Sequence, residues 1–123
     1  MEQLFCDTNA LIRLLDNDAV VVELLDGRQL HISVVTEMEM QCNPNLKATE
    51  RLVVKALLEQ CYIIDLTEAI KQRAVKVRLS TRLKLVDAIV AVSALVSQLP
   101  LVTSDGKFSA LQNDTTLILL PPR

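Results

Sequence analysis

Acidic side chains that directly follow apolar strands are the residues of this chain best suited to chemistry. Asp7 follows a short apolar run at 3–6, and Asp105 follows another at 101–103. The ligand crevice of an open parallel sheet lies beyond the carboxyl ends of its strands, so these two carboxylates converge if their strands are neighbours. Each also has a structural interpretation, because Asp7 can cap the helix that follows it and Asp105 can form an Asx-turn before a glycine.

A third acid, Asp87, stands in an otherwise apolar helical segment at 85–95. It shares a helical face with apolar residues such as Val90 and Ala91, and we expect that face to be buried. An unpaired ionised carboxylate would be strongly unfavourable there, so Asp87 must be hydrogen-bonded, paired with a base, protonated or bound to a cation. The structural alternative is that Asp87 caps the start of its helix.

Two further acids, Glu37 and Glu39, lie two residues apart on a predicted helix. They point about 200° apart, so only one of them faces the crevice, and the pattern alone does not choose between them. A solvated surface glutamate is the alternative for either. Four carboxylates gathered in one crevice raise one another's pKa and favour a divalent cation, so we predict a site for Mg²⁺ or Mn²⁺.

Other catalytic classes lack their residues. The only histidine, His31, falls in a predicted strand, so a Ser/His/Asp triad or a Cys/His pair has no base. The two glycines, Gly27 and Gly106, are too few for a glycine-rich phosphate loop. The three cysteines are an odd number without C-x-x-C spacing, which indicates reduced thiols in a cytoplasm rather than a disulfide framework or a zinc site.

Basic residues are concentrated in one stretch, where six of the thirteen lie within fourteen positions: Lys71, Arg73, Lys76, Arg78, Arg82 and Lys84. They predict a strip that contacts the phosphate backbone of RNA. The alternative is an ordinary solvated helix face. The net charge of -2 argues against a protein that coats nucleic acid by bulk charge.

Short apolar strands alternate with helical segments along the whole chain. We predict strands at 3–6, 30–34, 61–66, 101–103 and 115–120, and helices at about 10–15, 19–25, 35–40, 48–60, 67–79 and 86–98. Parallel strands need crossovers, which are usually helices, so this order predicts an α/β fold whose parallel sheet is covered on both faces.

The chain is expected to form one globular domain over residues 1–123. It has 123 residues, of which 50% are hydrophobic, enough for a single core. No membrane span is expected, because the most apolar stretch is too short and carries Asp87. The first residues lack a basic region and a long apolar run, so secretion is not indicated.

Four segments resemble, in order and spacing, the PIN domain and in particular the small VapC-like ribonuclease toxins of bacteria: residues 7–12, 32–40, 83–91 and 101–108. The resemblance covers essentially the whole chain and implies a three-layer α/β/α sandwich with a central, mainly parallel sheet. It also implies an acidic quartet that is catalytic and binds metal, namely Asp7, Glu39, Asp87 and Asp105. Thr8, Asn9 and Thr103 would be supporting polar groups.

The resemblance favours Glu39 over Glu37, because Glu39 takes the place of the glutamate in the family's Ala-Glu-Leu-like stretch. The chain departs from the family pattern at two positions. Val86 stands in place of a frequent proline, and Lys107 stands in place of an acid often found just before the phenylalanine. The second departure leaves open whether one or two metal ions bind.

The function implied by the resemblance is a Mg²⁺- or Mn²⁺-dependent endoribonuclease that hydrolyses RNA phosphodiesters. Such a protein would be the toxin of a toxin–antitoxin pair, a cytoplasmic homodimer that cuts structured RNA such as transfer RNA and is blocked by a small antitoxin. One alternative is a catalytically silent PIN-like module that binds RNA or protein, motivated by Lys107. Another is a phosphotransfer or phosphatase domain with Asp7 as nucleophile, against which Asn9 stands where a second aspartate would be wanted.

Overall fold

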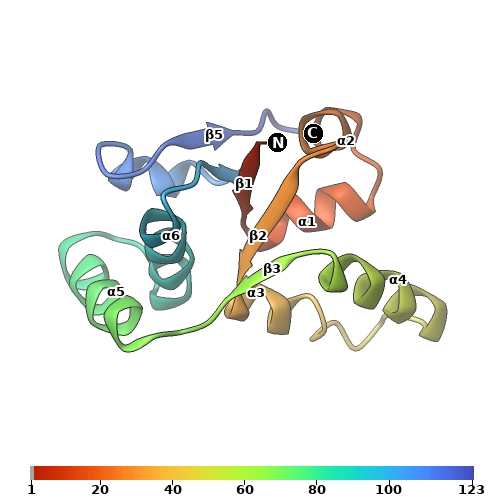
Figure 1. The fold of residues 1–123 in the computed structure, drawn as a ribbon, viewed down its shortest axis with the longest axis horizontal. Helices are drawn as coiled ribbons and strands as arrows, with labels where there is room; N and C mark the ends of the chain where they lie inside the picture. Colours follow the sequence, from red (N-terminus) through yellow and green to blue (C-terminus); the bar gives the residue numbers. More distant parts are fainter. Residues whose placement is uncertain (1) are drawn as a thin grey trace.

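The computed structural model describes residues 2–123 and contains a five-stranded sheet with the strand order β3-β2-β1-β4-β5, in which every pairing is parallel (Figure 1). The elements run in the order β1 (Gln3–Cys6), α1 (Thr8–Leu15), α2 (Ala19–Leu25), β2 (Gln29–Ser33), α3 (Val34–Glu39), α4 (Ala48–Glu59), β3 (Tyr62–Ile64), α5 (Glu68–Ser80), α6 (Leu85–Ser97), β4 (Leu101–Thr103), the 3₁₀ helix η1 (Gly106–Leu111) and β5 (Leu117–Leu119).

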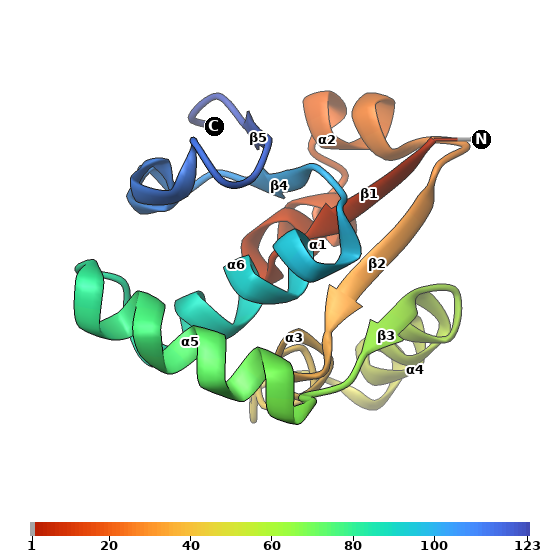
Figure 2. The ribbon, with the colours of Figure 1, turned by 60° about the vertical axis from the view of Figure 1, so that its left-hand side comes forward.

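Helices cover both faces of the sheet. In Figure 1, α5 and α6 lie to the left of β1 and β2, and α1, α2 and α4 lie to their right. The side chains of β1 alternate accordingly: Leu4 and Cys6 pack in the core with α1, α2 and α4, whereas Phe5 packs with α6 and η1. Figure 2 shows α5 lying along the outer side of α6, with which it shares a small core of its own. The predicted three-layer α/β/α sandwich is therefore confirmed.

Polar side chains directly before the first residue start several of the helices. Asp7, Asp18, Ser33 and Thr67 precede α1, α2, α3 and α5, and each side-chain oxygen accepts a hydrogen bond from a backbone N–H of the first turn. These bonds satisfy backbone donors that have no partner within the helix. They also hold the first turns of α1 and α3 directly at the carboxyl ends of β1 and β2.

The structure differs from the predicted elements at a few boundaries. The edge strands β3 and β5 have three residues each instead of the six predicted for either, and each pairs with only one neighbour. The predicted elements did not include η1, because a 3₁₀ turn lacks the 3.6-residue period that reveals an α-helix. Among residues 2–123 there is no helix long and apolar enough to cross a bilayer.

The strand order places a topological switch point between β1 and β4. From β1 the chain moves to β2 on one side, and from β4 it moves to β5 on the other. The two strands pair directly, with Phe5 opposite Leu101 and Cys6 opposite Val102. Ligand crevices in open α/β sheets form outside the carboxyl ends of strands at such a point. The site is therefore expected where Asp7 and Asp105 leave the sheet.

Candidate metal centre

A cavity of about 190 Å³ lies at the switch point, and all four predicted acids line it. Its walls are formed by Asp7, Thr8, Asn9, Glu39, Asp87, Val90, Asp105 and Phe108. The acids come from four separate places in the chain: the β1–α1 junction, the end of α3, the first turn of α6 and the segment after β4. Glu37 does not line the cavity, so of the two neighbouring glutamates only the preferred one reaches it.

Asp7 is held rigidly at the base of this cavity. Its side chain is buried, its Oδ1 accepts a hydrogen bond from the Ala10 N–H at 2.8 Å, and its Oδ2 accepts one from the Thr103 hydroxyl. The capping interpretation of Asp7 is thus correct, and it is compatible with a binding role. Each carboxylate oxygen has two lone pairs, so one hydrogen bond per oxygen leaves acceptor capacity on both.

The electrostatic environment of Asp7 favours a cation. Burial raises the pKa of Asp7 above its ordinary value, because an ionised carboxylate is poorly solvated there. The hydrogen bonds from Thr103 and Ala10 lower that pKa, and the negative charges of Asp105 and Asp87 raise it further. A cation bound in the cavity would favour the ionised form of Asp7. It would therefore oppose the effects of burial and of the neighbouring negative charges.

Thr103 connects Asp7 to Asp105. Its fully buried hydroxyl donates to Asp7 and accepts a hydrogen bond from the Asp105 N–H at 3.0 Å. Asp105 also forms the predicted turn, in which its Oδ1 accepts the Lys107 N–H at 2.9 Å and begins η1. The turn bond fixes the orientation of the Asp105 carboxylate and leaves its Oδ2 without a backbone partner.

The structure excludes the capping alternative for Asp87 and corrects its expected burial. It does not cap α6, because Lys84 occupies the N-cap position and Asp87 lies in the first turn. Its side chain is also half-exposed, at 27%, rather than buried with the apolar face of the helix. The reason is that the first turn of α6 borders the cavity, which gives the carboxylate access to solvent and to Lys107.

The ammonium of Lys107 pairs with two of the acids. Its Nζ lies 3.1 Å from Oδ2 of Asp105 and 3.7 Å from Oδ2 of Asp87. The hydrogen bond and charge of Asp105, together with the charge of Asp87, raise the pKa of Lys107, so the ammonium stays protonated at neutral pH. The chain thus supplies a cation of its own to part of the acidic cluster.

The side chain of Glu39 is held at the cavity by a hydroxyl group of a neighbouring helix. The Thr8 hydroxyl donates to Oε1 of Glu39 at 2.6 Å and lies 3.2 Å from the hydroxyl of Thr36, which is fully buried. Thr8 therefore joins the start of α1 to the last turn of α3. Thr36 was not predicted as part of the site, and its place between Val35 and Glu37 gives no sequence signal for that role.

The acids fit a hard divalent cation by type, but they are spread widely. Carboxylate oxygens are the ligands that Mg²⁺ and Mn²⁺ prefer, and four of them share one cavity in which an ammonium already pairs with two. Within residues 2–123, however, no three acidic, histidine or cysteine side chains stand close enough to hold one ion as they are placed. The donor set fits, and the carboxylates would have to draw together around an ion.

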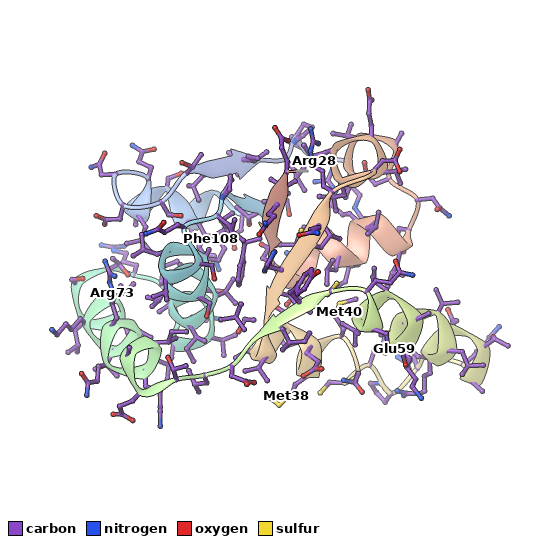
Figure 3. All side chains as sticks on the ribbon, in the orientation of Figure 1. Arg28, Met38, Met40, Glu59, Arg73 and Phe108 are labelled. Atoms are coloured by element: carbon purple, nitrogen blue, oxygen red, sulfur yellow. The ribbon has the colours of Figure 1, made fainter. Side chains whose placement is uncertain are left out.

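Apolar residues complete the cavity and were not predicted as part of it. Phe108 is buried against Phe5 and Val90 and lies between α6 and the strands in Figure 3. Its packing anchors η1, and with it the turn that carries Asp105. The only sequence signal for this role was the place of Phe108 in the segment resembling the PIN domain.

The six predicted basic residues are all exposed, but they do not form one row. On α5, Lys71 and Arg78 lie about 20° apart on one flank of the helix, whereas Arg73 and Lys76 lie on the opposite flank. Arg73 projects from α5 in Figure 3 and lines a different cavity, next to Gln98 at the end of α6 remote from Asp87. The remaining two, Arg82 and Lys84, lie in the segment that leads into the first turn of α6.

The comparison with family models decides the family. The PIN domain model matches residues 4–113, which include the four acids that line the cavity. The chain belongs to the PIN domain family. The prediction made from the four sequence segments is thereby confirmed. No curated protein sequence matches the chain.

Solved structures with the same fold include several from toxin–antitoxin complexes. A toxin–antitoxin complex from Klebsiella pneumoniae is similar at 27% identity and a TM-score of 0.81, covering 94% of this chain and 95% of that one. VapBC2 from Rickettsia felis, bound to a DNA fragment from its promoter, has 16% identity and a TM-score of 0.75, with 97% and 99% covered. DNA-bound VapBC from Salmonella typhimurium has 21% identity and a TM-score of 0.76, with 96% and 98% covered.

Proposed function

We propose that this PIN domain is a Mg²⁺- or Mn²⁺-dependent endoribonuclease that hydrolyses RNA phosphodiesters as the toxin of a toxin–antitoxin pair. The observation that carries the proposal is the cavity at the switch point, which four carboxylates from four elements line together. Membership of the PIN domain family supports a nuclease, and the similarity to the Klebsiella pneumoniae complex supports a toxin.

In the proposed centre, Asp7 and Asp105 hold the ion at the strand ends, and Asp87 and Glu39 complete its surroundings directly or through water. A divalent ion held by these residues would supply Lewis-acid chemistry, offsetting negative charge on the phosphodiester and making a water molecule more acidic. The hydrogen bonds from Thr103 and the Ala10 N–H keep the Asp7 carboxylate in one orientation.

Two further polar residues have supporting roles in the proposed centre. The bond from Thr8 keeps Glu39 turned toward the cavity. Asn9 lies on the cavity wall and is exposed, so its amide can contact the substrate. Hydrolysis by this arrangement needs no protein nucleophile, because a water molecule would attack phosphorus.

RNA would bind across the open side of the cavity. We propose that Arg82 and Lys84 contact the phosphate backbone next to Asp87, and that basic residues on one flank of α5 extend this contact. Arg73, which lines a cavity at the other end of α6, is not part of it. A structured RNA such as transfer RNA is the proposed substrate.

The proposed partners are a cognate antitoxin protein and a second copy of the chain, and the proposed compartment is the cytoplasm. The similar structures from Klebsiella pneumoniae and Salmonella typhimurium are toxin–antitoxin assemblies, which supports an antitoxin. The free thiols Cys6, Cys42 and Cys61 suit a reducing compartment. Sedimentation of the purified chain, alone and with an antitoxin, measures both assembly states.

The decisive experiment is cleavage of transfer RNA by purified protein with and without Mn²⁺. Asp7→Asn and Asp87→Asn should each lower the cleavage rate about 100-fold or more, because each removes a proposed ligand of the ion. Glu39→Gln should also lower it, whereas the matched control Glu37→Gln, which alters an acid outside the cavity, should not. Cleavage that persists without divalent ions, or that survives both aspartate substitutions, would rule out this mechanism.

A second candidate function is a catalytically silent module that binds RNA or protein, and the position of Lys107 favours it. An ammonium that pairs with both Asp87 and Asp105 could replace the metal permanently. Titration calorimetry separates the two functions: the silent module binds RNA or its partner but takes up no Mn²⁺, whereas the nuclease binds Mn²⁺ and loses that binding in Asp87→Asn.

A further inference from the structure

Lys107 is the only described cation that forms ion pairs with acids of the cavity, and it pairs with two of them. The contacts come from different elements, since Asp105 lies beside Lys107 in sequence and Asp87 lies on α6. The short turn closed by the Lys107 N–H and Oδ1 of Asp105 sets where the lysine side chain begins. The ammonium therefore reaches Asp87 because of the fold, and not because the two residues are close in the chain.

The two carboxylates cannot serve Lys107 and a metal ion equally. Oδ2 of Asp105 and Oδ2 of Asp87 are the oxygens that the ammonium contacts, and the turn bond to Oδ1 of Asp105 fixes the orientation of that carboxylate. A divalent ion bound to these Oδ2 atoms would lie beside the ammonium, and the repulsion between the two cations opposes keeping both in place. The side chain of Lys107 is 54% exposed, so it has room to swing into solvent without disturbing the core.

We propose that Lys107 is a tethered counter-ion which competes with the divalent metal for Asp87 and Asp105. Without metal it offsets the repulsion between the two carboxylates. When metal binds, it is released, and its ion pairs are lost. Lys107 thereby weakens metal binding and makes this PIN domain depend on a higher metal concentration than its four acids would otherwise require. The inference rests on the proposed metal centre and adds a residue that sets its affinity.

The test is titration of the purified, metal-free protein with Mn²⁺ alone, followed by calorimetry at low ionic strength. Lys107→Ala should bind Mn²⁺ about 5- to 30-fold more tightly than the wild type, as expected when two partly exposed ion pairs no longer have to be broken. Lys107→Arg, which keeps the charge, should bind nearly as weakly as the wild type. An increase in affinity cannot arise from a misfolded variant, so the direction of the effect is itself a control for folding.

Lys84→Ala is the matched control for removal of one positive charge. Lys84 is exposed, lies one turn before Asp87, and makes no side-chain capping bond to α6. Its removal should tighten Mn²⁺ binding by less than about threefold, because the charge is screened by solvent. An equal effect of Lys84→Ala and Lys107→Ala would overturn the proposal, since it would reduce the effect to net charge.

Thermal unfolding with added Mg²⁺ gives a second measurement. A ligand that binds only the folded state stabilises it by RT ln(1 + [L]/Kd), so the same Mg²⁺ concentration should raise the unfolding temperature more in Lys107→Ala than in the wild type. Equal affinities and equal shifts in these two proteins would refute the role of Lys107. If Asp87→Asn still abolished Mn²⁺ binding, the proposed metal centre would stand despite that result. If none of the variants bound Mn²⁺, the metal centre would be refuted together with this inference.

Discussion

Replacing Thr103 with valine should destabilise the fold more at neutral pH than at acidic pH. The substitution keeps the shape of a fully buried side chain and removes its hydroxyl. That hydroxyl donates to the Asp7 carboxylate and accepts from the Asp105 N–H, so two hydrogen bonds are lost at one atom. The prediction concerns the metal-free protein, in which the Thr103 hydroxyl stabilises the Asp7 carboxylate without help from a bound cation.

The magnitude follows from these two bonds. A hydrogen bond to a charged group contributes about 1.5–3 kcal/mol, and a backbone N–H left without a partner costs about 1 kcal/mol or more. We therefore expect Thr103→Val to lower the free energy of unfolding by about 2–4 kcal/mol at pH 7.5. A domain of this size typically has about 5–15 kcal/mol of stability, so the variant should remain folded.

The pH dependence has a defined sign. Burial already raises the pKa of Asp7 in the folded state above its value in the unfolded state. Protonated Asp7 therefore contributes stability at low pH, and this contribution is lost as pH rises through the folded-state pKa. The bond from Thr103 opposes that rise in pKa, so the valine variant raises the pKa of Asp7 further. The gap in stability between wild type and variant should therefore widen as pH increases and shrink on acidification.

The assay is urea unfolding in the presence of a chelator, from pH 4 to pH 8. Thr103→Ser is the matched control, because it keeps the hydroxyl and loses one methyl group, at a cost of about 0.5–1.5 kcal/mol that should not change with pH. Equal losses in the serine and valine variants, or a gap for Thr103→Val that stays constant across the pH range, would refute the argument that this hydroxyl holds the Asp7 carboxylate.

Two other predictions concern the residues around the site. Phe108→Ala should lower the free energy of unfolding by about 3–5 kcal/mol and weaken Mn²⁺ binding, since the ring anchors the turn of Asp105. Phe108→Leu, measured by the same urea unfolding, should lower it by less than about 1.5 kcal/mol. His31 stacks on Tyr62 with ring centroids 4.8 Å apart, both of its ring nitrogens lack hydrogen-bond partners, and burial lowers its pKa. Stability should therefore fall as pH drops below about 6.5, by up to about 1.4 kcal/mol per pH unit, and this loss should be absent in His31→Phe when unfolding is compared at pH 7.5 and pH 5.5.

Much of the fold was predictable because it is encoded locally. The alternation of short apolar runs with amphipathic segments identifies each α-helix and strand, and capping residues such as Asp7 and Ser33 mark where helices begin. Because these signals depend only on neighbours within a few residues, they can be interpreted without knowing the strand order. The shorter edge strands and η1 escaped prediction, since one-sided pairing and 3₁₀ turns leave weak patterns.

The sequence by itself determined the fold class, the residue types of the candidate site and the positions of Asp7 and Asp105 at strand ends. Only the tertiary structure decided that β1 and β4 are neighbours, that Glu39 rather than Glu37 reaches the cavity, and that Asp87 is half-exposed beside Lys107. The physical reason is the range of the contacts involved. The Thr103–Asp7 bond joins residues 96 positions apart, and such pairings depend on how the strands assemble, which no local pattern records.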